Sequence, residues 1–139
     1  MSAPAPTVSR MWDPQRTADQ YGVNVHVVRL PDGLAGCTDG TRVWVDDRLT
    51  LTERRCTLAH ELVHVWAGHT GHQGPKVEAW VRRTTARLLL RDQDVTSVLR
   101  TEPTLWDAAE RLGVTVPVLT DHLQGEPPWN SSSASSSSA

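Results

Sequence analysis

The stretch from Thr57 to His69, TLAHELVHVWAGH, constrains the fold of this chain more than any other. Its apolar residues recur at helical spacing, which predicts a helix with one buried face. Two histidines, His60 and His64, are four residues apart and therefore project from one face of that helix, one turn from each other. That separation is short enough for both imidazoles to hold one metal ion.

The residues on either side of this stretch indicate where the helix begins and ends. Thr50 is followed three residues later by Glu53, which is the spacing of a capping box. Gly68 is a suitable stop after the last apolar residue. The sequence therefore predicts one continuous helix that carries both histidines.

The order of residues in this helix is HExxH, a pattern with a known chemical use. Imidazole pairs of this kind suit zinc. Glu61 follows the first histidine and reaches a zinc-bound water rather than the metal, so it would take a proton from that water and later hand it to the leaving amine. The alternative is a buried helix whose histidines are satisfied by hydrogen bonds, although composition alone produces HExxH in roughly one such chain in a few hundred.

A catalytic zinc site needs a third protein ligand, and Glu78 is the candidate. Gly74 and Pro75 announce a second helix, and His64 and Glu78 each lie roughly 5 Å from the connecting loop at 1.5 Å per residue. Two antiparallel helices would bring these two residues level. Glu78 also lies at the edge of an apolar stripe, where an unpaired carboxylate is costly to bury. Its alternative role is a first-turn acid favoured by the helix dipole.

His69 and His72 are the rival ligands, five and eight residues after His64. The longer pattern HExxHxxGxxH fails, because Ala67 and Thr70 stand where it needs glycine and histidine. A loop histidine could still bind metal. We expect both to be loop residues, one of which could help polarise a substrate carbonyl.

The remaining segments predict an α+β fold. A short helix in residues 13–22 precedes three extended segments, residues 23–30, 33–40 and 41–47, which suggest a small, mostly antiparallel sheet. This sheet would pack on the HExxH helix and an antiparallel ligand helix, with a helical C-terminal portion. Cys56, one turn before His60, is expected to be a buried thiol outside the site.

Four segments follow from composition and pattern. We expect a disordered N-terminus at 1–9, a zincin-like core at 10–92, a helical portion at 93–125 and a disordered Pro/Ser tail at 126–139. The formal charge of −2 gives no general attraction to nucleic acid or membrane, and no apolar run approaches the roughly 20 residues of a membrane span. A cytoplasmic location is expected.

Residues 105–123 predict two short helices around Gly113 and are similar to a helix-turn-helix. The second helix would offer Thr115, Thr120, Asp121 and His122, with no arginine or lysine for phosphate. We therefore expect this unit to pack or to dock a protein, such as a repressor, and not to bind nucleic acid directly.

Two stretches of the chain resemble the ImmA/IrrE family of zinc metallopeptidases. GCTDGTRVWVDDRLTLTERRCTLAHELVHVWAGH is similar to the family's strand, acidic turn and LAHELGH helix, and EAWVRRTTARLLL is similar to its ExxAxxFAxxLL helix. The resemblance covers about residues 20–92 and implies that His60, His64 and Glu78 are the zinc ligands and that Glu61 is the catalytic base.

The chain departs from the family pattern at three positions. Val81 and Thr84 replace the family's alanine and phenylalanine, and Arg91 stands where a proline usually follows the double leucine. None of these residues is a candidate ligand, so the departures affect local packing rather than chemistry.

The family resemblance also implies a substrate. It implies cleavage of a regulatory DNA-binding protein, such as the repressor of a mobile element or stress pathway, with residues 41–47 pairing with the extended substrate at a sheet edge. Two alternatives stay open. The chain could be a zinc-containing anti-repressor that docks without cutting, or a DNA-binding regulator.

Overall fold

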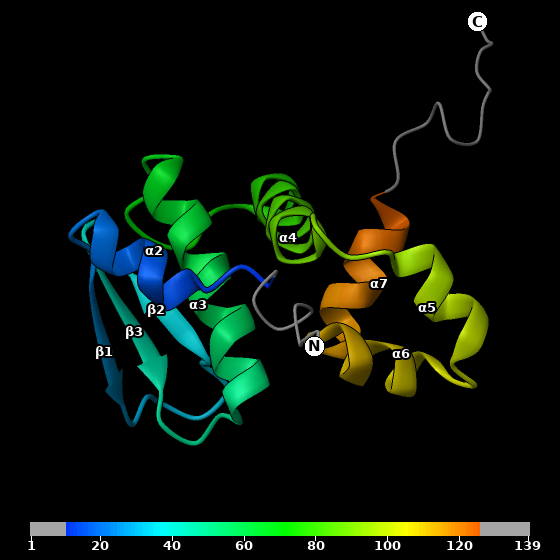
Figure 1. Cartoon of the computed structure of the whole chain (residues 1–139). Coiled ribbons are helices and arrows are strands. Elements are labelled where there is room, and N and C mark those ends of the chain that lie inside the picture. Colours follow the sequence, from blue (N-terminus) through cyan, green and yellow to red (C-terminus); the bar gives the residue numbers. More distant parts are fainter. Residues whose placement is uncertain (1–10, 126–139) are drawn as a thin grey trace, which may run out of the picture.

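The computed structural model describes residues 11–125, so the disorder predicted for 1–9 and 126–139 concerns residues outside this range. A small sheet lies on one side of the molecule and a group of helices on the other (Figure 1). In chain order the elements are α2 (Pro14–Gln20), β1 (Asn24–Val28), β2 (Gly36–Thr38), β3 (Arg42–Asp46), α3 (Leu51–Trp66), α4 (Pro75–Leu90), α5 (Val95–Thr101), α6 (Leu105–Leu112) and α7 (Val116–Gln124). Within the described range, no helix combines the length and apolar character needed to cross a membrane.

The α+β class is confirmed, and the sheet has the order β1-β3-β2. β2 and β3 form an antiparallel hairpin, closed by a turn in which the Asp39 carboxylate accepts hydrogen bonds from the backbone N–H groups of Thr41 and Arg42. β1 pairs with β3 in parallel. The sheet is therefore mixed rather than mostly antiparallel, because the chain between β1 and β2 is long enough for β3 to insert between them.

The boundaries of α3 are those predicted from its flanking residues. The Thr50 hydroxyl accepts from the N–H of Glu53, and the Glu53 carboxylate accepts from the N–H of Thr50, which completes the capping box. The helix ends at Trp66 with Ala67 as its C-cap, and Gly68 follows with φ of +81°, a left-handed conformation that favours glycine. This turn directs the chain back toward the helix that it has just left.

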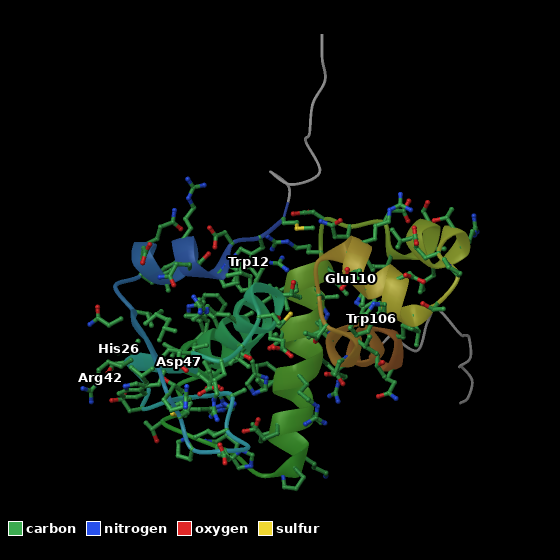
Figure 2. All side chains as sticks on the ribbon, turned by 90° about the horizontal axis from the view of Figure 1, so that it is seen from below. Trp12, His26, Arg42, Asp47, Trp106 and Glu110 are labelled. Atoms are coloured by element: carbon green, nitrogen blue, oxygen red, sulfur yellow. The ribbon has the colours of Figure 1, made fainter. Side chains whose placement is uncertain are left out.

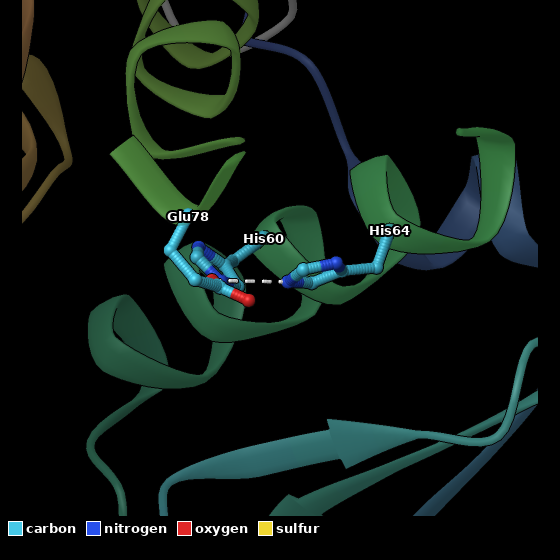
Figure 3. Close-up of side chains that lie close together, drawn as sticks. All are labelled: His60, His64 and Glu78. Carbon is cyan, nitrogen blue, oxygen red and sulfur yellow. Dashed lines mark hydrogen bonds and ion pairs between the residues drawn. The ribbon is translucent and has the colours of Figure 1, made fainter. Parts of the chain in front are cut away.

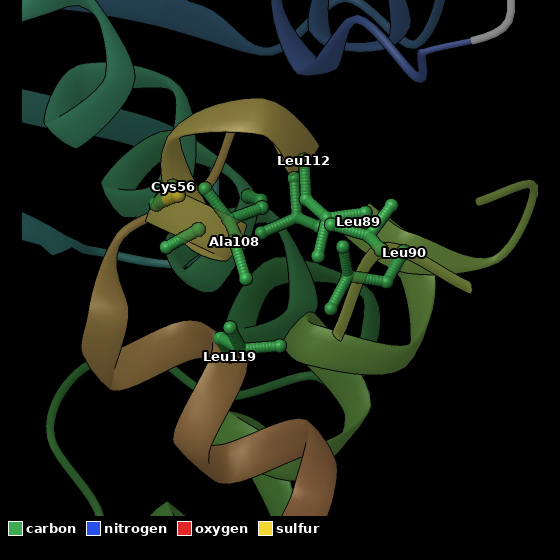
Figure 4. Packing of buried hydrophobic residues seen from close by; sticks show 10 residues of the cluster. Cys56, Leu89, Leu90, Ala108, Leu112 and Leu119 are labelled. Carbon is green, nitrogen blue, oxygen red and sulfur yellow. The ribbon is translucent and has the colours of Figure 1, made fainter. Parts of the chain in front are cut away.

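α3 separates two hydrophobic clusters and contributes to both. Toward the sheet, Leu58 and Leu62 pack with Val43 and Val45 of β3. On the other side Cys56 and Ala59 join the cluster shown in Figure 4, where α4 and the C-terminal helices supply Leu89, Leu90, Ala108, Leu112 and Leu119. Cys56 is the buried thiol expected from the sequence, and burial raises its pKa.

The second helix begins where the sequence predicts, with Gly74 as N-cap and Pro75 in the first turn. Its direction differs from the prediction. α3 runs across the view of Figure 1 whereas α4 is seen along its axis, so the two helices cross and are not antiparallel. α4 packs against both α3 and α7. The buried stripe consequently runs through Glu78, Val81, Thr85 and Leu89, while Val77 is exposed.

The two short helices predicted around Gly113 are α6 and α7, and Gly113 has the left-handed φ of +74°. Leu119 of α7 is fully buried against α4 and α6. Side chains on the same helix are mostly half-buried. The C-terminal helices therefore share a core with α3 and α4.

Gly36 allows β2 to lie directly on α3, and this close approach can be tested. A Cβ added there would lie 2.6 Å from Cγ2 of Thr57 and 3.1 Å from the carbonyl oxygen of Trp44. We expect Gly36→Ala to lower the free energy of unfolding by about 1–3 kcal/mol, because the packed helix and strand have to separate. Urea unfolding followed by circular dichroism measures the change.

Two further variants control for this prediction. Thr57→Ser removes the nearest clashing methyl group and should recover part of the loss in the double variant. Gly71→Ala, where the added Cβ would meet only the Thr38 carbonyl oxygen at 4.0 Å, should leave stability nearly unchanged. An equal loss in both glycine variants would contradict close packing as the cause.

Candidate metal site

The three residues predicted as metal ligands come together at the crossing of α3 and α4. Oε1 of Glu78 lies 3.4 Å from Nε2 of His60 and 3.2 Å from Nε2 of His64 (Figure 3). Within the described part of the chain they are the one group of three such side chains that could hold a metal ion. Among residues 11–125, neither His69 nor His72 joins this group.

Local structure explains why these side chains meet. His60 and His64 are one turn apart on α3, and their rings lie with centroids 5.0 Å apart. Glu78 is in the first turn of α4, immediately after the loop that follows Gly68. The N–H of Gln73 donates to Oε2 of Glu78 at 2.7 Å, which leaves Oε1 directed at the two imidazoles. The two helices need not be antiparallel for the three ligands to meet, because Glu78 lies in the first turn of α4.

The spacing of the three donor atoms fits a small divalent cation. A tetrahedral ion with bonds of about 2.0–2.1 Å separates its ligand atoms by about 3.3 Å. The carboxylate oxygen meets that value to both imidazole nitrogens, at 3.4 Å and 3.2 Å. All three ligand atoms lie within 4.8 Å of one another. Two nitrogens and one carboxylate oxygen are also a common ligand set for catalytic zinc.

The protonation states of these groups suit a ligand role. Burial lowers the pKa of both His60 and His64, so their rings are neutral with a free lone pair near neutral pH. Burial acts to raise the pKa of Glu78, but the Gln73 N–H and the neighbouring histidines lower it overall. A metal ion would therefore meet two neutral imidazoles and one carboxylate.

His69 has a part that sequence reasoning did not assign. Its Nδ1 lies 2.9 Å from Nδ1 of His64, while Nε2 of His64 faces Glu78. His69 therefore orients the ring of His64 from the side away from the ligand cluster. The sequence feature that could have indicated this contact is the helix stop at Gly68, because the left-handed turn there returns the chain to α3. His72 lies 3.4 Å from Oε2 of Glu78, but its side chain is 86% exposed.

Glu61 is buried beside the cluster without belonging to it. Burial, together with the negative charge of Glu78, raises the pKa of Glu61 to about 7. Glu61 and His60 line a cleft of about 390 Å³ whose other walls come from β2, α4 and α7. A carboxyl group that titrates near neutral pH in a cleft can exchange protons with a bound molecule.

The cleft is bordered by an open sheet edge, which is β2. The N–H of Asp46 donates to the carbonyl oxygen of Ala35, and in an antiparallel ladder the next residue turns its backbone groups the other way. Gly36 and Thr38 thus direct their N–H and C=O groups toward the open edge. The expectation that residues 41–47 pair with a substrate is wrong, because β3 is the central strand and is paired on both sides.

A comparison with protein families identifies the chain. The family model described as the IrrE N-terminal-like domain, of peptidase family M78, matches residues 16–122. The chain belongs to this family. The match covers most of the described residues and includes the C-terminal helices as well as the metal cluster, so it supports a metallopeptidase-type role for the whole unit. No curated protein and no solved structure matches the chain significantly.

The contact between His69 and His64 leads to a testable expectation. His69→Ala should weaken affinity for a divalent cation such as Co²⁺ by about 10-fold to 100-fold, because the His64 ring loses the partner that orients it. Competition with a chromogenic chelator measures the affinity. His26→Ala, which removes a histidine on the outer face of the sheet, is the control and should bind Co²⁺ normally. Equal affinities for the two variants would contradict a positioning role.

Proposed function

We propose that this member of the M78 family is a zinc-dependent metallo-endopeptidase that hydrolyses a peptide bond in a regulatory protein. One observation carries the proposal: the His60, His64 and Glu78 cluster lies beside a buried acid, Glu61, at the wall of a cleft with an open strand edge. Metal ligands, a base and a peptide-binding edge are the parts that hydrolysis of a peptide bond requires.

The ligand set favours zinc. Two imidazoles and one carboxylate are the donors of known zinc hydrolases, whereas magnesium and calcium prefer oxygen ligands alone. Zinc held by these three residues would polarise the substrate carbonyl and lower the pKa of a water molecule.

Glu61 supplies the proton transfer. With a pKa of about 7, its carboxyl group changes protonation state near neutral pH, so it can accept a proton from the attacking water and later donate that proton to the leaving amine. Its position one residue after His60 places it on the cleft side of α3. Because Glu61 is buried, its electrostatic interactions with the attacking water and with the leaving amine are screened less than they would be in bulk water.

The open edge of β2 accounts for how a peptide would be held. An extended peptide can add a strand there, with its backbone bonded to Gly36 and Thr38, so that its scissile carbonyl passes the ligand cluster. Binding through the backbone selects an extended conformation rather than a particular side chain. It also requires a substrate segment that is unfolded or can unfold locally.

A DNA-binding repressor is our proposed substrate class, supported by the family resemblance. The packing of α7 argues against direct DNA binding by this chain. Leu119 is fully buried, Thr120 and Asp121 are half-buried, and Oδ1 of Asp121 lies 3.8 Å from Nε of Arg82 on α4. A helix packed in this way would have to leave α4 to enter a major groove.

Substitution of the proposed base tests hydrolysis. Glu61→Gln should keep one zinc per chain and lower the rate of peptide cleavage by about 100-fold to 10,000-fold, because the amide cannot take the proton. Zinc content by atomic absorption and cleavage of casein-derived peptides measure the two properties. Glu102→Gln, which removes a surface carboxylate paired with Arg111, should change neither.

Two other results would redirect the proposal. Loss of zinc in Glu61→Gln would make Glu61 a ligand. An unchanged biological effect of that variant in cells would favour an anti-repressor that docks without cutting.

Substitution of the third ligand tests the metal site. Glu78→Ala should weaken zinc affinity by at least about 10-fold, because one of three ligands is lost from a buried position. Competition with a fluorescent zinc chelator measures the affinity. Normal zinc binding in Glu78→Ala, combined with loss of binding in His72→Ala, would assign the third ligand to His72 instead.

A further inference from the structure

The cleft at Glu61 does not end at the metal cluster. A second hollow of about 450 Å³ lies between the start of α3, α6 and the start of α7. Glu53, Thr115 and Pro117 line both hollows. The two hollows therefore adjoin each other at the first turn of α7, with Glu61 in the first and Trp106 in the second.

The end of the second hollow at Trp106 is apolar and exposed. Trp106 is 65% exposed, and its neighbour Leu105 is 44% exposed. Val114, Val116 and Ala109 continue the apolar lining toward the first turn of α7. Covering an exposed indole with another apolar side chain removes apolar surface from water and therefore lowers the free energy. This end is suited to an aromatic or large aliphatic side chain.

The charge of the same end is acidic. Glu110 and Trp106 are four residues apart on α6 and so lie on one face of that helix; both are labelled in Figure 2. Glu53 faces the same hollow from α3. Neither carboxylate takes part in an ion pair within residues 11–125, and no lysine or arginine from that range lines the hollow. A basic partner would meet the Glu110 carboxylate, close to Glu53, whose carboxylate also accepts from the N–H of Thr50.

We propose that the two adjoining hollows form one groove, which holds the substrate on one side of the scissile bond and selects an aromatic or large aliphatic residue next to a lysine or arginine. The inference rests on the proposed peptidase function, since the groove begins at the residues assigned to cleavage. Trp106 contacts the apolar side chain, and Glu110 contacts the cation, with the capping carboxylate of Glu53 adding negative charge nearby. Specificity then comes from helices α6 and α7, while β2 binds any extended backbone.

A binding selection tests the groove without requiring cleavage. The zinc-loaded Glu61→Gln protein is immobilised and challenged with a random library of 12-residue peptides, and the retained peptides are sequenced. We expect enrichment of about 3-fold to 10-fold for Trp, Phe or Leu next to Lys or Arg, which is the range of one aromatic contact. Absence of this enrichment would overturn the proposal.

Variants on the same background assign the selection to residues. Trp106→Ala should lose the apolar preference, and Glu110→Lys should reverse the basic preference to an acidic one, a result that misfolding cannot produce. Trp80→Ala removes a tryptophan that is 45% exposed on α4 and lines neither hollow, and it should select as the parent does. Unchanged selection by Trp106→Ala and Glu110→Lys would also overturn the proposal.

The retained peptides then separate the two hypotheses. They are incubated with the zinc-loaded wild-type protein, and products are identified by mass spectrometry. Selection without any cleavage would contradict the peptidase function and leave the groove assignment intact. Cleavage with no preference that depends on Trp106 or Glu110 would contradict the groove assignment and leave the peptidase function intact.

Discussion

The contact on which the candidate site depends is the one between the Glu78 carboxylate and the imidazoles of His60 and His64. A buried carboxylate beside two neutral rings is costly unless donors or a cation compensate for the lost water. The N–H of Gln73 supplies one donor, to Oε2. A divalent cation between Oε1 and the two nitrogens would supply the rest. Metal binding and the packing of α4 on α3 are therefore coupled, so ligand substitutions should affect both affinity and stability.

α3 can hold its side chains in place because both of its sides are covered. The sheet packs on Leu58 and Leu62, and the C-terminal cluster packs on Cys56 and Ala59. A helix fixed in this way presents His60, Glu61 and His64 at defined positions, which is the arrangement that a catalytic site requires. The close approach of β2 at Gly36 has the same effect, since it sets the open strand edge beside Glu61.

The C-terminal helices form part of the wall of the cleft at Glu61. α7 buries Leu119 against the shared core and lines the cleft with Thr115 and Pro117. The helix-turn-helix pattern in the sequence corresponds to two short helices around the left-handed Gly113, and a local connection of this kind does not by itself specify a function. Its use here is to close one wall of the groove and to carry Trp106 to its far end.

The sequence by itself determined what local interactions specify. Thr50, Glu53 and Gly68 set the ends of α3, Gly74 and Pro75 set the start of α4, and the HExxH spacing placed two imidazoles one turn apart. Tertiary structure alone decided what depends on distant segments meeting. Examples are the parallel pairing of β1, the crossing of α3 and α4, the contact of His69 with His64, and the adjacency of the two hollows. Each brings together residues whose proximity no helical or strand period encodes. Local periodicity reports which face of an element is buried, but not which element buries it.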